Sequence, residues 1–336
     1  MTTKVSPAME GQATQKNAII NGNFDIWQRG TSQTTEGYGS DDRWKLRVAG
    51  SAVTHSRQTF TPGQSDVPNN PTYHSRNVIT SVLDPSNNIF TQQKIEGVST
   101  LAGETVTLSF WAKADAAKNI ATEFVQQFGS GGSPSSSVTE LGVTTHALTT
   151  SWKQFTVTLT LPSISGKTLG TDDNDFVQLN FWFDAGSNFD SRTNSLGQQS
   201  GTFDIAQVQI ENGNTATDFE NRSVGEELTL CQRYYQRLSG SFNFVGTGMC
   251  HSSAQWDVII SFAVMRTNPT VTVSNVSDFL LVNATGGGLA MTSITGAGAS
   301  TSTSRMYGNV SSGLVAGNAT LLYIINSGWI DFDAEL

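Results

Sequence analysis

Cysteine and charged residues are both scarce in this 336-residue chain. There are two cysteines, Cys231 and Cys250, and 14% of the residues are charged. Two cysteines are too few for a disulfide framework. We predict a pair of buried thiols, with a single bridge between them as the alternative. The low charge, with abundant Ser, Thr and Gly, is typical of strands with polar outer faces rather than of a helix-rich enzyme.

Positive charge and long apolar runs are also lacking. The 19 Lys and Arg are scattered, and the 28 Asp and Glu bring the net charge to −9. Nucleic-acid binding needs a basic stripe that neutralises phosphates, so this function class is excluded. The longest apolar run, Val258–Val264, is too short to cross a bilayer. The opening MTTKVSPAMEGQ has no apolar core of signal-peptide length. We expect neither a nucleic-acid partner nor membrane insertion.

Catalytic motifs are missing as well. The four histidines, His55, His74, His146 and His251, have no metal-ligand spacing, and no GxSxG, P-loop or dinucleotide fingerprint occurs. A glycosidase needs two carboxylates about 5–10 Å apart. With 28 acidic residues, the sequence cannot single out such a pair. We interpret these residues as surface charges and predict that the protein is not an enzyme.

The sequence does contain long alternating strands. In Thr105–Ala114, apolar Val, Leu, Phe and Ala alternate with polar residues and Trp111. This period of two indicates strands with one buried face. It recurs in Ile120–Phe128, Trp152–Leu161, Phe176–Phe183 and Phe203–Ile210. We predict an all-β fold: a flexible arm over residues 1–16, then a β-sandwich over residues 17–222.

After this domain the hydrophobic period changes. Ser223 and Glu226 form a capping-box pattern, and Leu228, Cys231, Tyr235 and Leu238 follow on one face of a helix. This predicts a connecting helix over residues 223–239. Its Tyr234 and Tyr235 are assigned to packing at the junction between domains rather than to a ligand patch.

Residues 240–336 return to a strand pattern and predict a smaller, β-sandwich-like domain. Its short strands would bury a small core on their own. We therefore expect this domain to form oligomers.

Several aromatic residues are candidates for carbohydrate binding, because flat rings stack on the C–H faces of sugars. The candidates are Trp111, Trp182, Trp44 and Tyr38. Trp111 and Trp182 are favoured since both are out of phase with the apolar residues of their strands. The alternative for each is ordinary core packing.

Oxygen ligands for calcium are a second candidate. Asp25 and Asp204, with Asn23 nearby, would lie on the first and last strands of the sandwich. Because Ca²⁺ takes six to eight oxygens, two carboxylates are a minimal set. The alternative is that both are surface aspartates. A structural Ca²⁺ is thus the one cofactor that the sequence suggests.

Seven segments together resemble a known family, namely phage tail-fibre and virion proteins with a carbohydrate-binding-like jelly roll. The helix segment ELTLCQRYYQR is similar to the "LCQRYY" helix that ends this module, and the terminal GWIDFDAEL resembles the closing strand of a fibre-tip domain. The jelly roll itself is matched by IINGNFDIWQRG, GYGSDDRWKL, LAGETVTLSFWAKA, SWKQFTVTLTLP and FDIAQVQIENGNTATDFENRS. The resemblance covers residues 17–238 well and the rest loosely.

The resemblance implies a virion fibre or spike, exposed on the particle and made in the host cytoplasm. It implies binding to host surface polysaccharide, contact with other virion proteins, and a homotrimer. Asp204 matches an acidic position in the last strand of the family's jelly roll, and Asp25 matches more weakly. The alternatives are a purely structural virion protein, such as a capsid decoration or tail-assembly component, and a polysaccharide depolymerase.

Overall fold

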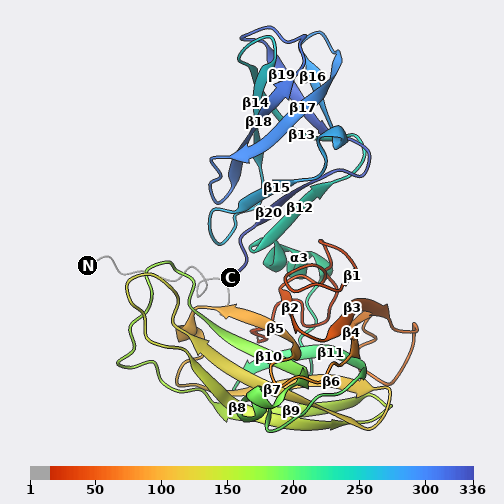
Figure 1. Ribbon diagram of the computed structural model, residues 1–336, viewed down its shortest axis with the longest axis vertical. Coiled ribbons are helices and arrows are strands. Elements are labelled where there is room, and N and C mark those ends of the chain that lie inside the picture. The colour runs from red at the N-terminus through yellow and green to blue at the C-terminus, as the bar shows by residue number, and fades with distance from the viewer. Residues whose placement is uncertain (1–15) are drawn as a thin grey trace. The chain divides into compact units, whose positions relative to one another are not determined.

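A computed structural model describes residues 16–336, so the predicted arm over residues 1–16 lies outside the described part except for Lys16. The chain divides into two compact units. Unit 1 comprises Met1–Glu227 together with Leu336, and unit 2 comprises Leu228–Glu335. Figure 1 colours the chain by residue number, so unit 1 runs from red through yellow to green and unit 2 from blue-green to blue, while the final residue, Leu336, belongs to unit 1.

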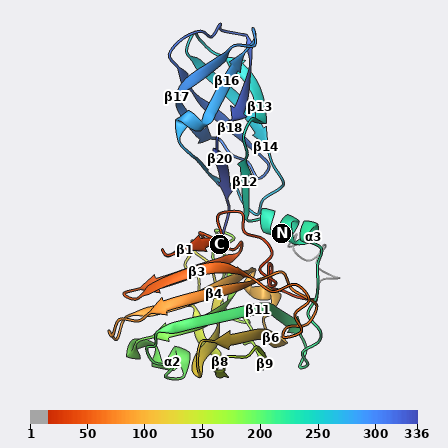
Figure 2. The ribbon, with the colours of Figure 1, turned by 90° about the vertical axis from the view of Figure 1, so that its right-hand side faces the viewer.

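The first sheet of unit 1 has six antiparallel strands in the order β1-β3-β4-β11-β6-β9. Figure 2 shows β3, β4, β11 and β6 side by side in this order. The last strand of the unit in sequence, β11, therefore lies in the middle of the sheet. The strands are β1 (Ser32–Gln33), β3 (Ala52–Thr59), β4 (Tyr73–Thr80), β6 (Thr105–Ala114), β9 (Lys153–Thr160) and β11 (Gly201–Asn212).

The second sheet of unit 1 has five antiparallel strands in the order β2-β5-β10-β7-β8. Three short helices accompany it: η1 (Val98–Thr100), η2 (Ser187–Phe189) and α2 (Asp190–Thr193). The strands are β2 (Trp44–Ala49), β5 (Asn88–Glu96), β7 (Lys118–Gln127), β8 (Val138–Leu148) and β10 (Phe176–Ala185).

The core of unit 1 lies between the two sheets, as the alternating pattern predicted. Phe110 of β6 packs edge-on against Phe181 of β10, with ring centroids 4.9 Å apart, and stacks on Phe155 at 5.5 Å. All three rings belong to one buried apolar cluster. The predicted all-β class and the β-sandwich are confirmed.

A bulge in β11 shapes the centre of the first sheet. Gln207 and Val208 face a single residue of β6, and Gln207 adopts a left-handed backbone with φ of 48°. Beyond the bulge β11 leaves β4 and bonds the N-terminal segment instead. Val208 donates to the Gly22 carbonyl at 2.9 Å, and Ala18 donates to Ile210 at 2.9 Å. The segment thus continues the sheet where β4 ends.

The predicted capping box is present at the start of helix α3 (Val224–Gln232). The Ser223 amide donates to the Glu226 carboxylate at 2.8 Å, and the Glu226 amide donates to Ser223 Oγ at 3.3 Å. The predicted end at residue 239 is wrong. The helix ends at Gln232, and Tyr235–Ser239 forms strand β12, paired with β20 (Trp329–Asp333). Pairing with that distant strand overrides the local helical spacing.

Unit 2 contains a closed barrel of six strands in the order β13-β14-β18-β17-β16-β19. The predicted sandwich-like arrangement is corrected, since closure gives every barrel strand two neighbours. A three-stranded sheet, β12-β20-β15, completes the unit together with η3 (Val276–Asp278). The remaining strands are β13 (Asn243–Cys250), β14 (Gln255–Ser261), β15 (Thr270–Val273), β16 (Phe279–Asn283), β17 (Gly288–Ala297), β18 (Thr303–Val310) and β19 (Ala319–Ile324).

Two further features of the sequence can be located. Cys231 and Cys250 are both buried thiols. Among the helices in residues 16–336, none is both long enough and apolar enough to span a membrane.

Candidate functional site

A pocket of about 160 Å³ lies on the outer face of the six-stranded sheet of unit 1. We call it the Trp111 pocket. Most of its lining side chains are polar, and one indole ring contributes a flat apolar surface. The lining residues are Pro68, Asn69, Ser109, Trp111, Gln154, Gln207, Asp218 and Phe219.

The floor of the pocket comes from adjacent strands of the sheet. Trp111 of β6 faces Gln154 of β9 on one side and Ala206 of β11 on the other. Because alternate residues of β6 point into the core, Trp111 and Ser109 share the outer face. Trp111 is half-buried and packs against a small outer cluster that includes Phe60. The bulge brings Gln207 to the same floor.

The first wall is the loop between β3 and β4. Val67 anchors this loop in the outer apolar cluster, with 1% of its surface exposed. The Gln64 side chain bonds both the amide and the carbonyl of Val67, at 2.9 and 2.8 Å. Gln207 Nε2 donates to the Pro68 carbonyl at 2.8 Å and joins this wall to the floor. These contacts fix the position of Asn69.

The second wall is the segment that follows β11. Gln209 Nε2 donates to the Asp218 carbonyl at 3.3 Å, and Gln209 Oε1 accepts from the Glu220 amide at 2.8 Å. The Glu211 carboxylate accepts from the Thr217 amide at 3.0 Å. Burial alone would raise the pKa of Glu211, but its hydrogen bonds with Thr217 outweigh this effect and hold the pKa below its usual value. The wall that carries Asp218 is therefore held at both ends.

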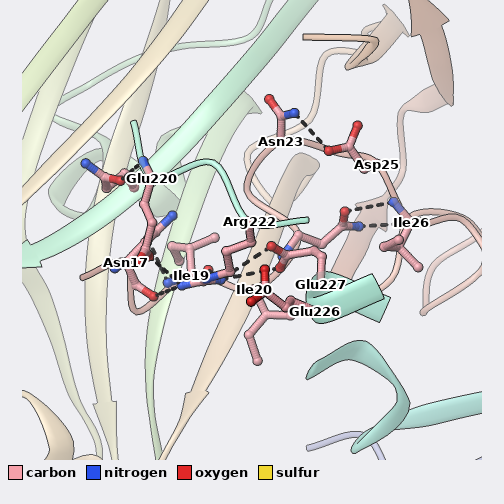
Figure 3. Close-up of polar contacts among 12 residues, drawn as sticks. Asn17, Ile19, Ile20, Asn23, Asp25, Ile26, Glu220, Arg222, Glu226 and Glu227 are labelled. Carbon is pink, nitrogen blue, oxygen red and sulfur yellow. Dashed lines mark hydrogen bonds and ion pairs between the residues drawn. The ribbon is translucent and has the colours of Figure 1, made fainter. Parts of the chain in front are cut away.

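The same segment is also tied to the N-terminal segment, residues 17–22, as Figure 3 shows. The Glu220 carboxylate accepts from the Asn17 amide at 2.9 Å, and Arg222 Nη1 donates to the Ile19 carbonyl at 3.0 Å. The Glu227 carboxylate accepts from the Asn21 amide. Burial raises the pKa of Glu227, although the Asn21 amide and Arg222 oppose this. All three contacts are made to backbone atoms of residues 17–21. Glu220, Arg222 and Glu227 therefore hold the N-terminal segment through its main chain, independently of its side chains.

A row of charges crosses the sheet beside the Trp111 pocket. Asp204 of β11 faces Arg76 of β4 and Lys113 of β6 in register. The Arg76 guanidinium holds the Asp204 carboxylate with two hydrogen bonds of 2.7 and 2.8 Å, and Lys113 Nζ lies 3.8 Å away. His74 Nε2 lies 3.6 Å from the same carboxylate. We call these four residues the Asp204 row.

The predicted calcium role of Asp204 is corrected by these neighbours. Burial would raise the pKa of Asp204, but the two hydrogen bonds from the Arg76 guanidinium outweigh it and the pKa is lowered. A carboxylate already neutralised by cations does not attract Ca²⁺, which needs several oxygen ligands. Asp204 instead positions the cations around it.

Asp25, the other predicted calcium ligand, lies beside Asn23. Its side chain accepts a 2.8 Å hydrogen bond from Asn23 Nδ2 (Figure 3). Burial raises the pKa of Asp25 despite that bond. Within residues 16–336, no group of three or more His, Cys, Asp and Glu side chains has the arrangement of a metal site.

Two of the predicted aromatic candidates are corrected. Trp182 is fully buried under Phe189 of η2, with centroids 5.4 Å apart, and its Nε1 donates to Glu123. Trp44 is buried in the sandwich core, where it stacks on Phe24 at 5.3 Å. Neither indole has a face on the surface, so neither can stack on a sugar.

The other predicted residues occupy varied positions. Tyr38 is half-buried, with Arg29 5.5 Å and Lys45 5.6 Å from its ring centre, and it does not line the Trp111 pocket. Tyr234 and Tyr235 are buried in unit 2. The Tyr234 carbonyl accepts from the Ala334 amide at 2.8 Å.

Of the predicted candidates, Trp111 lines this pocket, whereas the sequence did not point to the polar residues around it. Gln154 and Gln207 both lie in predicted strands. Strand alternation could have identified Gln154 as a residue on the outer face of its strand, and Gln207 follows Ala206, which pairs with Trp111. Asn69, Asp218 and the bulge lie where no period exists, so nothing local indicates their proximity to Trp111.

Comparisons with known proteins give a distant structural similarity. No family model matches the sequence, and no curated protein matches it. Among solved structures, the chain is similar to a CBM4 structure, with 19% identity over 57% of this chain and 98% of that chain and a TM-score of 0.33. It is also similar to a family 11 carbohydrate-binding module of a Clostridium thermocellum cellulase, with 12% identity over 55% of this chain and 96% of that chain and a TM-score of 0.33.

A third similar structure comes from a phage. It is the enzymatically active domain of tailspike protein 4 of bacteriophage CBA120, with 14% identity and a TM-score of 0.35. The match covers 59% of this chain and 21% of that chain. All three TM-scores are below 0.5, so these similarities carry no functional conclusion.

Proposed function

We propose that unit 1 binds carbohydrate at the Trp111 pocket and that the chain is a non-catalytic phage fibre or spike protein that attaches to host surface glycans. One observation carries the binding proposal. A half-buried indole shares a pocket with amide, hydroxyl and carboxylate side chains, namely those of Asn69, Ser109, Gln154, Gln207 and Asp218.

The chemistry of this combination suits a sugar. The indole face stacks on the C–H surface of a sugar ring. The surrounding amides and the hydroxyl donate to and accept from sugar hydroxyls, while Asp218 accepts. Both walls are held by hydrogen bonds, so little side-chain and loop entropy is lost on binding. At about 160 Å³ the pocket is smaller than the sites of drug-sized ligands, which span about 300–1,000 Å³. It suits a single sugar unit of a longer chain.

The lining residues also argue against catalysis. Among the described residues that form the pocket, Asp218 alone carries a carboxyl group. Hydrolysis of a glycosidic bond by the usual route requires two carboxyl groups. The pocket is therefore better suited to holding a sugar than to cleaving its linkage.

The virion assignment rests on the sequence. The segments IINGNFDIWQRG and ELTLCQRYYQR resemble those of phage fibre and virion proteins. On this basis the partners are other virion proteins and host polysaccharide. A homotrimer would be assembled through unit 2, and the location would be the exposed surface of the particle.

The test is binding of the full chain to lipopolysaccharide and capsule preparations of the host bacterium. Wild-type protein should bind, and Trp111→Ala should weaken binding about tenfold or more, because the stacking surface is lost. The matched control is Tyr307→Ala, which removes an exposed ring from unit 2 and should leave binding unchanged.

Other outcomes point to the alternatives. No binding by the wild type would overturn the proposal and favour a structural virion protein, whose loss weakens particles but leaves adsorption intact. New reducing ends in the polysaccharide would favour a depolymerase.

A further inference from the structure

We propose that the Asp204 row and Trp152 form a subsite for the carboxylate of an acidic sugar, so that the Trp111 pocket takes a uronate-bearing glycan. This inference names the ligand class of the proposed carbohydrate site and rests on that function. It starts from the register of the sheet. Trp111 and Lys113 lie two residues apart on β6 and share its outer face, about 6.6 Å from each other along the strand.

The subsite carries an excess of positive charge in an acidic protein. The row contains Arg76, Lys113 and one carboxylate, Asp204, whereas the whole chain has a net charge of −9. The Asp204 carboxylate is held by Arg76 Nε and Nη2, which leaves the Nη1 edge of the guanidinium for a second anion. The Arg76 and Lys113 side chains are 32% and 29% exposed, so a ligand can reach both.

An aromatic wall borders this charge. Lys113 Nζ lies 5.2 Å from the centre of the Trp152 ring. Trp152 in turn packs on Phe60, with centroids 5.2 Å apart, and edge-on against His74 at 5.1 Å. The half-buried Trp152 thus supplies an apolar surface next to the ammonium group, the combination that a sugar ring with a carboxylate requires.

A buried polar group in the same place is left unsatisfied. The His74 side chain is 6% exposed, and neither of its ring nitrogens makes a hydrogen bond to a described residue. A buried polar group without a hydrogen bond costs free energy. Because both nitrogens are closed off from solvent, His74 supports Asp204 and Trp152 from beneath and does not itself contact a ligand.

The charges also give the site a direction. Asp218 lies at the Ser109 end of the Trp111 pocket, since Gln209, which faces Ser109, donates to the Asp218 carbonyl. Lys113 lies beyond Trp111 at the other end of the same strand face. A ligand carboxylate is repelled from the Asp218 end and attracted to the Lys113 end, while sugar hydroxyls can donate to Asp218.

The test uses the full chain and pairs of glycans. Oligomers of galacturonate, glucuronate and mannuronate are each compared with the same oligomer after its carboxyl groups are reduced to alcohols. We expect at least one acidic oligomer to bind about tenfold more tightly than its reduced partner, the value of one charge-assisted hydrogen bond. The difference should shrink as salt is added.

Variants separate the two parts of the site. Lys113→Gln should reduce the preference for the acidic form, with Arg76 still in place, and leave affinity for the reduced form unchanged, whereas Lys113→Arg should retain the full preference. The control Lys167→Gln alters another lysine that lies over a ring, 5.5 Å from the centre of Phe128, and should change nothing. Arg76 is left intact because its removal would leave Asp204 buried beside weaker partners.

The outcomes distinguish this inference from the proposed function. Equal affinity within every pair, or a preference for the reduced forms, would overturn the uronate subsite while Trp111-dependent binding to host glycan still stands. The same holds if host glycan binds but no acidic oligomer does. Loss of all glycan binding would instead overturn the proposed function itself.

Discussion

Arg192 and Glu123 are joined by two parallel hydrogen bonds, Nε to Oε1 and Nη2 to Oε2, each 2.8 Å long. The Glu123 side chain is fully buried and also accepts from Asn180 and from Trp182 Nε1. The Arg192 guanidinium lies 5.0 Å from the centre of the Trp182 ring. This pair holds α2 and the residues around it over the outer face of the five-stranded sheet.

Breaking that pair should be costly. Arg192→Ala leaves the Glu123 carboxylate buried without its cation, and we expect a loss of about 3–5 kcal/mol in the free energy of unfolding of unit 1, measured in urea. The control is Arg47→Ala, whose pair with Glu36 is about 40% exposed on both sides. It should cost at most about 1 kcal/mol. Equal losses in the two variants would contradict the assigned role of Glu123.

The stability of unit 1 should depend on His146 in acid. Burial against Phe110 and Phe155 lowers the pKa of His146 to about 4, while its usual value is 6.5. The folded state therefore binds the proton less well than the unfolded state. The stabilising effect of the neutral ring is complete above pH 6.5 and is lost as the pH falls toward 4, by at most about 3 kcal/mol.

The measurement is the free energy of unfolding between pH 8 and pH 4 for wild type and His146→Gln. Carboxylates contribute equally to both proteins, so the difference between the two curves isolates His146. Parallel curves would contradict the prediction.

His55 should affect the pH dependence of stability in the opposite direction. Burial alone would lower its pKa, but Asp41, 2.6 Å away, outweighs burial and raises the pKa. The stability from that pair is present below pH 6.5 and is lost as the pH rises through the raised pKa.

Two glycines should respond oppositely to alanine. A Cβ at Gly22 would overlap the Val208 carbonyl oxygen, which belongs to the bulge of β11. Gly22→Ala should therefore destabilise unit 1 by about 3 kcal/mol. A Cβ at Gly225 in α3 meets nothing within 4 Å, so Gly225→Ala should stabilise by about 0.5–1 kcal/mol through helix propensity. Urea unfolding compares them, and a neutral Gly22→Ala would show that β11 shifts easily.

The sequence predicted the strands themselves better than the residues that pack against them. Trp111 and Trp182 have the same out-of-phase position in their strands, yet one lines a pocket and the other is buried. The difference arises because Phe189 and Leu196, which follow β10 in sequence, cover Trp182. Strand alternation shows which face a residue occupies but not what covers that face.

The helix and Asp204 show the same limit. The spacing from Leu228 to Leu238 fits a helix, but Leu238 pairs in a sheet with Ile330, which lies 92 residues further along the chain. Similarly, Asp204 matched an acidic position of a family pattern, while its chemistry is set by Arg76 and Lys113 on other strands. Local patterns do not contain such pairings.

The central position of β11 has a consequence for biosynthesis. The strands β4 and β6 are translated long before β11, which is their shared neighbour. Until residue 212 leaves the ribosome, each has an edge that can pair with another nascent chain. The contacts between residues 17–22 and 208–210 also join the start of unit 1 to its end. Unit 1 therefore cannot fold progressively during synthesis, and its high contact order predicts slow acquisition of the native state after release.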